Sequence, residues 1–324
     1  AGSSFSWTNN NPSIGLGATG SANLGSFIGI NSGSQLETAV ISVVPTYTFG
    51  NQQCTGQALN FEINVLPLPQ VDPTPDETFC HLSQASVNFS SASNPVTFNW
   101  TSLPNAIGLT NLGQGNINFI GQNTSANSLG ATVLVNATYT LNGTSCTGPN
   151  DTLLITILPQ VMTSGSPNQL LCNGDSSAAV IWNSSLPNST FSWQSLGANT
   201  GFAASGFGNT PPTLVSNPSN SQQQTSLVGL ATFQLNGASC PGIPDTVIVQ
   251  VNPTPILSFG QANQVLCSGS TSQVVNLNST VAGANMSWIV SNVSAGLTGW
   301  NQTSGTGPLP AATLANSSNT TASV

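Results

Sequence analysis

Apolar and polar residues alternate with a period of two along short stretches of the chain. The clearest case is the segment 131–141, where one of the two alternating sets is apolar: Val133, Val135, Ala137, Tyr139 and Leu141. This period places alternate side chains on opposite faces of a β-strand. Similar short runs occupy 87–89, 96–100 and 152–158, each bounded by Gly, Asn, Ser or Pro. Because no stretch of ten or more residues has a helical period, the pattern predicts an all-β protein.

The strand pattern recurs about every 93 residues. One marker is a tryptophan that closes an F-S-W-like run, at Trp7, Trp100, Trp193 and Trp288. A second is a cysteine in a predicted β-hairpin, best seen in ATYTLNGTSCTGPNDTLLITILP (137–159), at Cys54, Cys146 and Cys240. A third is an opening cysteine about 20 residues before the tryptophan, at Cys80, Cys172 and Cys267. Three markers with one period predict a tandem array.

About seven short strands per repeat are typical of an immunoglobulin-like β-sandwich. The markers divide the chain into two complete domains, 68–159 and 160–253, flanked by partial domains at 1–67 and 254–324. The first partial domain lacks an opening cysteine and the last lacks a hairpin cysteine, so we expect a window on a longer array. Proline follows the last strand of each repeat, which ends strand pairing and favours an extended connection. The predicted fold is therefore an extended array of tandem Ig-like domains.

The charged residues of the chain limit the kinds of partner that it can bind. The chain has no Lys or Arg, one His and eight acidic residues, which gives a net charge of -8. A chain without cations cannot neutralise phosphates, so we expect no binding to nucleic acid or docking on anionic lipid. No apolar run approaches the roughly 20 residues of a membrane span, and membrane insertion is not expected.

Six cysteines in a β-rich, Asn/Thr-rich chain indicate an oxidising, extracytoplasmic setting. Pairing across the linkers would join Cys54 to Cys80, Cys146 to Cys172 and Cys240 to Cys267. Pairing within a domain would join Cys80 to Cys146 and Cys172 to Cys240, leaving Cys54 and Cys267 with partners outside the window. Loop entropy does not favour one of these two pairing schemes over the other, since a disulfide of either scheme stabilises the fold by roughly 3 to 4 kcal/mol.

Strand geometry favours pairing within a domain. The last hairpin is expected to turn at the end of the sandwich where the domain's own first strand begins. The last strand would leave from the other end, about 25 Å away for seven or eight residues, beyond the roughly 7 Å Cα limit of a disulfide.

The phased aromatic residues are predicted core residues: Trp7, Trp100, Trp193, Trp288, Tyr47, Tyr139 and Phe233. Trp182 and Trp300 fall outside the tryptophan register, so they are the candidates for exposed, sugar-stacking aromatics.

Candidate chemistry is otherwise weak. Asp72, Asp76 and Glu77 lie together in one linker and form a weak Ca²⁺ candidate, but the matching linkers contain no acid. His81 has no counterpart in the other repeats and no positioned nucleophile or carboxylate. With a single His, zinc-ligand spacing is absent as well. We therefore expect neither an enzyme nor a cofactor.

The motifs NGASCPGIP (236–244), VNPTP (251–255) and VLCSG (265–269) resemble those of the PKD-like, Ig-like repeats of giant Bacteroidota surface proteins. That resemblance covers the whole chain and is strongest over 231–300. Such repeats fill adhesins, including gliding-motility adhesins, that the type IX system exports. The resemblance thus implies an extracellular or cell-surface location. It also implies O-glycan sites at Thr152 and Thr246, where Asp precedes Thr and an apolar residue follows.

The leading hypothesis is a structural stalk of a large extracellular adhesin or appendage, which provides reach and mechanical strength for attachment to an unknown surface or cell ligand. A self-assembling, homo-oligomeric filament subunit is an alternative, because neutral faces can pack laterally without charge repulsion. A carbohydrate-binding module of a secreted protein is a third. Expected partners are neighbouring repeats or further copies of the chain.

Overall fold

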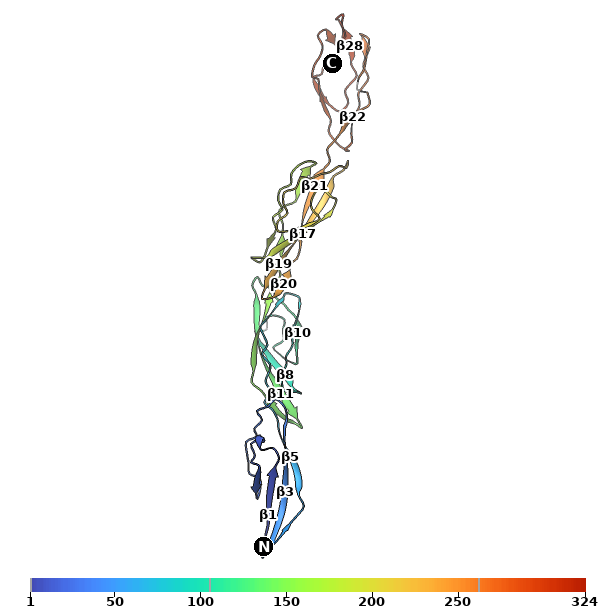
Figure 1. Ribbon diagram of the computed structural model, residues 1–324. Coiled ribbons are helices and arrows are strands. Elements are labelled where there is room, and N and C mark those ends of the chain that lie inside the picture. The colour runs from blue at the N-terminus through green and yellow to red at the C-terminus, as the bar shows by residue number, and fades with distance from the viewer. Residues whose placement is uncertain (1, 105, 262) are drawn as a thin grey trace. The chain divides into compact units, whose positions relative to one another are not determined.

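The computed structural model describes residues 2–104, 106–261 and 263–324. Regular structure in these ranges is β-strand, apart from a short 3-10 helix, η1 (Pro12–Ile14) (Figure 1). The chain forms two compact units, Ala1–Val161 with Phe233–Cys240, and Met162–Thr232 with Pro241–Val324. Below, first to fourth repeat refer to 1–67, 68–159, 160–253 and 254–324.

The second repeat is a two-sheet sandwich. One sheet has the order β6-β13-β11-β8-β9, with β12 also paired to β11, and the other pairs β10 with β7. Strand β6 runs parallel to β13, whereas the neighbours of β11 are antiparallel to it. The bounds are β6 (Glu77–Cys80), β7 (Gln84–Val87), β8 (Thr97–Leu103), β9 (Leu112–Gln114), β10 (Ile117–Ile120), β11 (Leu129–Leu141), β12 (Thr144–Thr147) and β13 (Asp151–Leu158).

The third repeat has the same arrangement. Its larger sheet has the order β15-β21-β19-β17-β18, with β20 paired to β19, and its smaller sheet pairs β14 with β16. The bounds are β14 (Thr163–Ser164), β15 (Gln169–Cys172), β16 (Asn183–Ser184), β17 (Thr190–Gly197), β18 (Ser205–Phe207), β19 (Gln223–Leu235), β20 (Ala238–Pro241) and β21 (Asp245–Asn252).

The first and fourth repeats contain parts of this plan. In the first, one sheet joins β1 (Gly2–Asn9), β2 (Thr19–Ser21), β3 (Glu37–Phe49), β4 (Gln52–Thr55) and β5 (Leu59–Val65). In the fourth, three small sheets pair β22 with β24, β25 with β27, and β28 with both β23 and β26. Their bounds are β22 (Leu257–Phe259), β23 (Ser270–Thr271), β24 (Leu277–Ser279), β25 (Ser287–Ile289), β26 (Leu297–Thr298), β27 (Ser304–Thr306) and β28 (Thr313–Asn316).

The predicted alternation along β11 is confirmed. Its apolar set is buried from Ala131 to Tyr139, while Thr132, Leu134 and Thr140 are exposed. Together with the absence of helices longer than η1 among the described residues, this establishes an all-β, Ig-like sandwich fold repeated along the chain.

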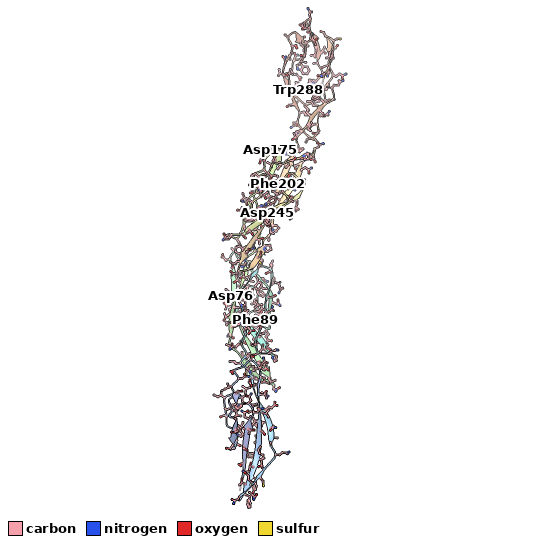
Figure 2. All side chains as sticks on the ribbon, viewed as in Figure 1. Asp76, Phe89, Asp175, Phe202, Asp245 and Trp288 are labelled. Carbon is pink, nitrogen blue, oxygen red and sulfur yellow. A yellow bond between two sulfur atoms is a disulfide. The ribbon has the colours of Figure 1, made fainter. Side chains whose placement is uncertain are left out.

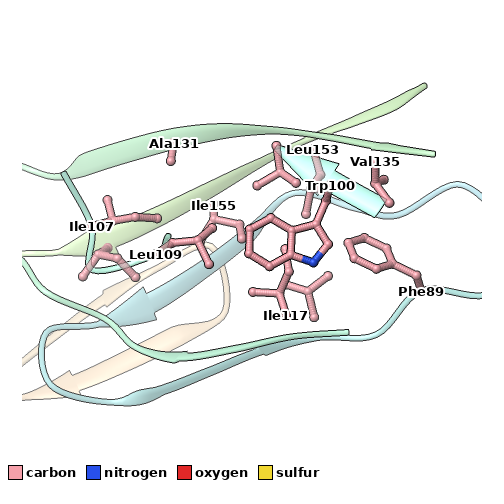
Figure 3. Packing of buried hydrophobic residues seen from close by; sticks show 12 residues of the cluster. Phe89, Trp100, Ile107, Leu109, Ile117, Ala131, Val135, Leu153 and Ile155 are labelled. Carbon is pink, nitrogen blue, oxygen red and sulfur yellow. The ribbon is translucent and has the colours of Figure 1, made fainter. Parts of the chain in front are cut away.

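The phased tryptophans pack against a glycine on the neighbouring strand. The aligned pairs are Trp7 with Gly20, Trp100 with Gly113, Trp193 with Gly206, and Trp288 with Gly305. A methyl group on any of these glycines would press into the indole ring. Figure 3 shows Trp100 among the side chains that surround it in the core of the second repeat, including Phe89, Ile117 and Ile155. The indole Nε1 of each of the four tryptophans is buried without a hydrogen-bond partner, so the ring acts as an apolar plate.

Not every phased aromatic lies in a core. Tyr139 is buried, Phe233 is half-buried, and Tyr47 is 46% exposed, so the prediction of a core position for Tyr47 is wrong. In the second repeat, the backbone of Pro69 lies directly against Gly148 of the hairpin, where a methyl group could not fit. Among the described residues no such segment covers the equivalent hairpin that carries Tyr47.

Candidate functional site: a disulfide between repeats

The two cysteines of the second repeat lie at opposite ends of its last strand. Cys80 ends β6 and is aligned with Leu158 at the end of β13. Cys146 in β12 is aligned with Tyr139 of β11, beyond the point where Val135 faces Asp151 at the start of β13. The separation of the two cysteines therefore exceeds the length of β13, which is about 25 Å for eight residues at roughly 3.3 Å each.

The disulfide joins Cys80 to Cys240, with a Cα–Cα distance of 5.5 Å. The predicted pairs Cys80–Cys146 and Cys172–Cys240 are therefore wrong, and so is the alternative that pairs cysteines across each linker. The error lies in the position of the opening cysteine, which the prediction places at the wrong end of the sandwich. Because β6 runs parallel to β13, its cysteine lies where the chain leaves the domain.

Cys240 reaches Cys80 from the hairpin of the next repeat. The segment Phe233–Cys240, which contains the tip of the β19–β20 hairpin, belongs to the same compact unit as the second repeat. Cys240 is 2% exposed. The bond thus links the second repeat to the third and closes a loop with a sequence separation of 160. Cys54, Cys172 and Cys267 are exposed free thiols, and Cys146 is a half-buried one.

The acidic residues near the linkers bind backbone amides. Asp76, which is labelled in Figure 2, accepts a hydrogen bond from the backbone N–H of Leu154 at 2.8 Å. In the third repeat the neutral Asn168 accepts the equivalent bond from Ile248 at 2.8 Å. Because the amide of Asn168 replaces the carboxylate of Asp76, this hydrogen bond to the strand edge does not depend on charge. Its role is to hold the linker against the last strand.

The Ca²⁺ candidate is not assembled as a ligand cluster. Asp72 accepts a hydrogen bond from the hydroxyl of Ser90 at 2.7 Å, whereas Glu77 lies within β6 opposite Ile155. The described residues contain no group of three or more His, Cys, Asp or Glu side chains close enough to hold a metal ion.

His81 has a structural partner. Its Nδ1 accepts the backbone N–H of Asn123 at 2.9 Å. Asn173 does the same in the third repeat, where its Oδ1 accepts the backbone N–H of Asn217 at 2.8 Å. The two side chains are thus interchangeable loop anchors.

The prediction that Trp182 is exposed is wrong, and Trp300 is only partly exposed. Trp182 is 3% exposed and belongs to the core of the third repeat, where its Nε1 donates to the hydroxyl of Thr210 at 3.3 Å. Trp300 is half-buried, and its ring centroid lies 6.1 Å from that of Trp288. Trp182 therefore supplies no exposed sugar platform, and Trp300 leaves only part of its ring exposed.

A glycine signal could have placed Trp300 correctly. In each repeat a glycine with positive φ precedes a large apolar residue, at Gly15, Gly108, Gly201 and Gly299. The following residues are Leu16, Leu109, Phe202 and Trp300, of which the first three are buried. Alignment on these glycines, whose left-handed backbone only glycine adopts at low cost, places Trp300 at the position that a buried apolar residue occupies in the other three repeats.

The candidate O-glycan sites lie on exposed strand positions. Thr152 and Thr246 are exposed, and the aspartate before each binds the backbone of the linker. Asp151 accepts the N–H of Thr74 at 3.3 Å, and Asp245 accepts that of Gly165 at 2.8 Å. The aspartates of these motifs thus have a structural role of their own.

The third repeat also carries a shallow groove on the outer face of its larger sheet. Its lining includes Gln194, Phe207 and Leu230, and Phe207 is 90% exposed. All of the lining side chains are uncharged. In the described part of the chain, no helix is long and apolar enough to cross a membrane.

Comparisons with known proteins give structural neighbours only. No protein-family model and no curated protein matches the sequence. Titin domains I67–I69 match with 7% identity and a TM-score of 0.38, covering 77% of this chain and 89% of theirs. Domains 1–5 of Sidekick-1 match with 12% identity and a TM-score of 0.25, covering 98% and 67%. A SusE-like surface-located polysaccharide-binding protein from the Bacteroides thetaiotaomicron heparin utilisation locus matches with 11% identity and a TM-score of 0.26, covering 67% and 52%.

Proposed function

We propose that this chain is a structural stalk of a large extracellular adhesin or surface appendage, without enzymatic activity, that gives reach and mechanical strength for attachment. Its resemblance to Bacteroidota adhesin repeats supports export by the type IX system. The observation that carries the proposal is the Cys80–Cys240 bond between two consecutive Ig-like repeats. A crosslink between repeats limits how far a loaded chain can lengthen, a property that a ligand-binding domain does not need.

The bond defines which residues bear load. Force applied at the two ends passes from Cys80 to Cys240 through the sulfur atoms. The residues between the two cysteines therefore bear no tension. That loop has a sequence separation of 160, and at about 3.4 Å per residue its hidden contour length is roughly 540 Å. Repeats that unfold inside the loop therefore add little length until the bond is reduced.

Single-molecule stretching of the full chain tests this role. We expect the final contour length to increase by roughly 500 Å when a reductant is added. The Cys80→Ser, Cys240→Ser double variant should show the long contour length without reductant. The Cys54→Ser variant, which removes an exposed free thiol, should behave like the parent chain. Equal contour lengths with and without reductant would contradict the stalk proposal.

The second candidate, a homo-oligomeric filament subunit, is favoured by exposed apolar side chains that could pack between copies. Ile28, Phe49 and Phe207 are 84%, 69% and 90% exposed. Light scattering of the full chain separates the two functions, because a stalk stays monomeric over a wide concentration range and a filament subunit forms a defined oligomer.

A further inference from the structure

The bonded cysteines occupy positions that every complete repeat reproduces. Cys80 is aligned with Leu158 at the end of β13, and Cys172 is aligned with Asn252 at the end of β21. The turn that follows is the same in both, since each cysteine carbonyl accepts the N–H three residues later, at 3.2 and 3.1 Å. Cys172 thus has the local geometry of the bonded Cys80.

The hairpin cysteines are equivalent to one another as well. Cys54 and Cys146 are each aligned with a tyrosine on the long strand of their hairpin. Two residues after each hairpin cysteine a glycine N–H binds a backbone carbonyl of the long strand, at 2.8, 2.9 and 2.8 Å for Gly56, Gly148 and Gly242. The bonded Cys240 therefore shows what Cys54 and Cys146 are placed to do.

We propose that the Cys80–Cys240 bond is one instance of a rule in which the opening cysteine of each repeat bonds the hairpin cysteine of the repeat that follows it. Cys172 is then the docking site for the hairpin of a following repeat of this type, and Cys146 is the site for the opening cysteine of a preceding one. The same separation of 160, counted backward from the hairpin cysteines Cys54 and Cys146 and forward from the opening cysteines Cys172 and Cys267, gives positions outside residues 1–324. The rule therefore accounts for all four free thiols as well as for the single bond.

The rule fits the exposure of these thiols. Cys172 is exposed at the end of its sandwich, where Cys80 is covered by its partner. The hairpin tip is uncharged, with Asn236 and Gly237, and the strand end beside Cys172 carries the neutral Asn252. The one carboxylate at this site, that of Asp175, already accepts the backbone N–H of Cys172 at 2.8 Å. The partner is thus a neutral hairpin of the same sequence type, carried by the adjacent repeat.

The test is a chain in which residues 160–253 are inserted a second time after Pro253. The junction places Pro253 before Gln160, as Pro159 precedes it in the parent chain. Ser176→Thr and Ser239→Thr changes in the inserted copy, both at exposed positions, distinguish by mass its opening-cysteine peptide and its hairpin peptide from those of the first copy. Mapping of disulfide-linked peptides after oxidative folding should join the first-copy Cys172 to the inserted hairpin cysteine, while Cys80 keeps the first-copy Cys240.

Thiol counting under denaturing conditions provides a second measurement. The insertion adds two cysteines, and the rule predicts that four thiols remain free, as in the parent chain. A matched insertion whose hairpin cysteine is Ser should have five. The rule is overturned if the inserted copy, shown by hydrogen exchange to be folded, pairs its own two cysteines, leaves Cys172 reduced, or bonds it only between separate chains.

Discussion

At the scale of single residues, two repeats solve the same packing problem with different side chains. Phe89 and Trp182 occupy equivalent positions, since the backbone N–H of each binds an asparagine side chain at 3.0 Å, Asn116 or Asn209. The residue that faces the phased tryptophan on the long strand is Val135 in the second repeat and Gly229 in the third. Thus the repeat with the larger ring, Trp182, has the smaller residue, Gly229, on its long strand.

This exchange predicts a strong coupling between positions 182 and 229. Gly229→Val should destabilise the third repeat by about 1 to 3 kcal/mol, because any Cβ at this position would overlap the Trp182 ring. Adding Trp182→Phe recreates the pair of the second repeat and should recover most of the loss. Hydrogen exchange of peptides from β19 measures the effect.

The matched control is Gly25→Ala, because a methyl group there meets no atom within 4 Å. If Trp182→Phe lowers protection equally in the presence and absence of Gly229→Val, the two residues are independent and the size argument fails.

At the scale of elements, an asparagine loop fixes the end of the last strand in the second and third repeats. Asn217 donates from Nδ2 to the carbonyls of Ser221 and Val251, at 2.8 and 2.7 Å. Asn123 makes the same two bonds, to Asn127 and Ile157. Both asparagines are buried, and their bonds to Val251 and Ile157 satisfy buried carbonyls at the ends of the last strands. Asn123 also begins an N-T-S sequon, and its burial makes it a poor acceptor for a glycan in the folded chain.

Asn217→Ala should therefore loosen the loop and the end of β21. The buried carbonyl of Val251 loses its donor, whereas that of Ser221 keeps the hydroxyl of Ser219. We expect a cost of about 1 to 3 kcal/mol, read as faster hydrogen exchange over 215–225 and 249–252. Asn220→Ala is the matched control, because Asn220 is exposed in the same loop. Similar exchange rates in the two variants would show that the buried amide is dispensable.

The strands could be predicted from sequence, whereas the cysteine pairing could not. The alternation in 131–141 marks β11 because one face of that strand is buried along its length. The direction of β6 leaves no comparable signal in the sequence. A four-residue edge strand has the same residue pattern whether it pairs parallel or antiparallel to its neighbour. The end at which Cys80 lies depends on that direction. Similarly, Trp182 lies in a core because Gly229 makes room for it, and this relation becomes visible only when the two strands are aligned.

At the scale of the whole molecule, the absence of Lys and Arg provides an experimental advantage. Trypsin has no cleavage site in the chain, so a single introduced lysine creates the only one. Asn220 lies in an exposed loop between the two bonded cysteines, and Gln57 lies at an exposed position outside them. These two positions therefore allow one backbone cut to be placed inside or outside the disulfide loop.

We expect trypsin to leave the Asn220→Lys variant at full apparent mass on a non-reducing gel and to yield two fragments only after reduction. The Gln57→Lys variant should separate into two fragments without reductant. Fragments from Asn220→Lys under non-reducing conditions would show that the Cys80–Cys240 bond does not form in solution.

The disulfide thereby gives the chain redundancy against cleavage. Between residues 81 and 239 the two ends of the molecule are joined twice, once through the backbone and once through sulfur. A single protease cut in this region damages a domain but does not detach what lies beyond it. For a protein exposed to extracellular proteases, the bond between repeats would then set how many cuts are needed before the two ends separate.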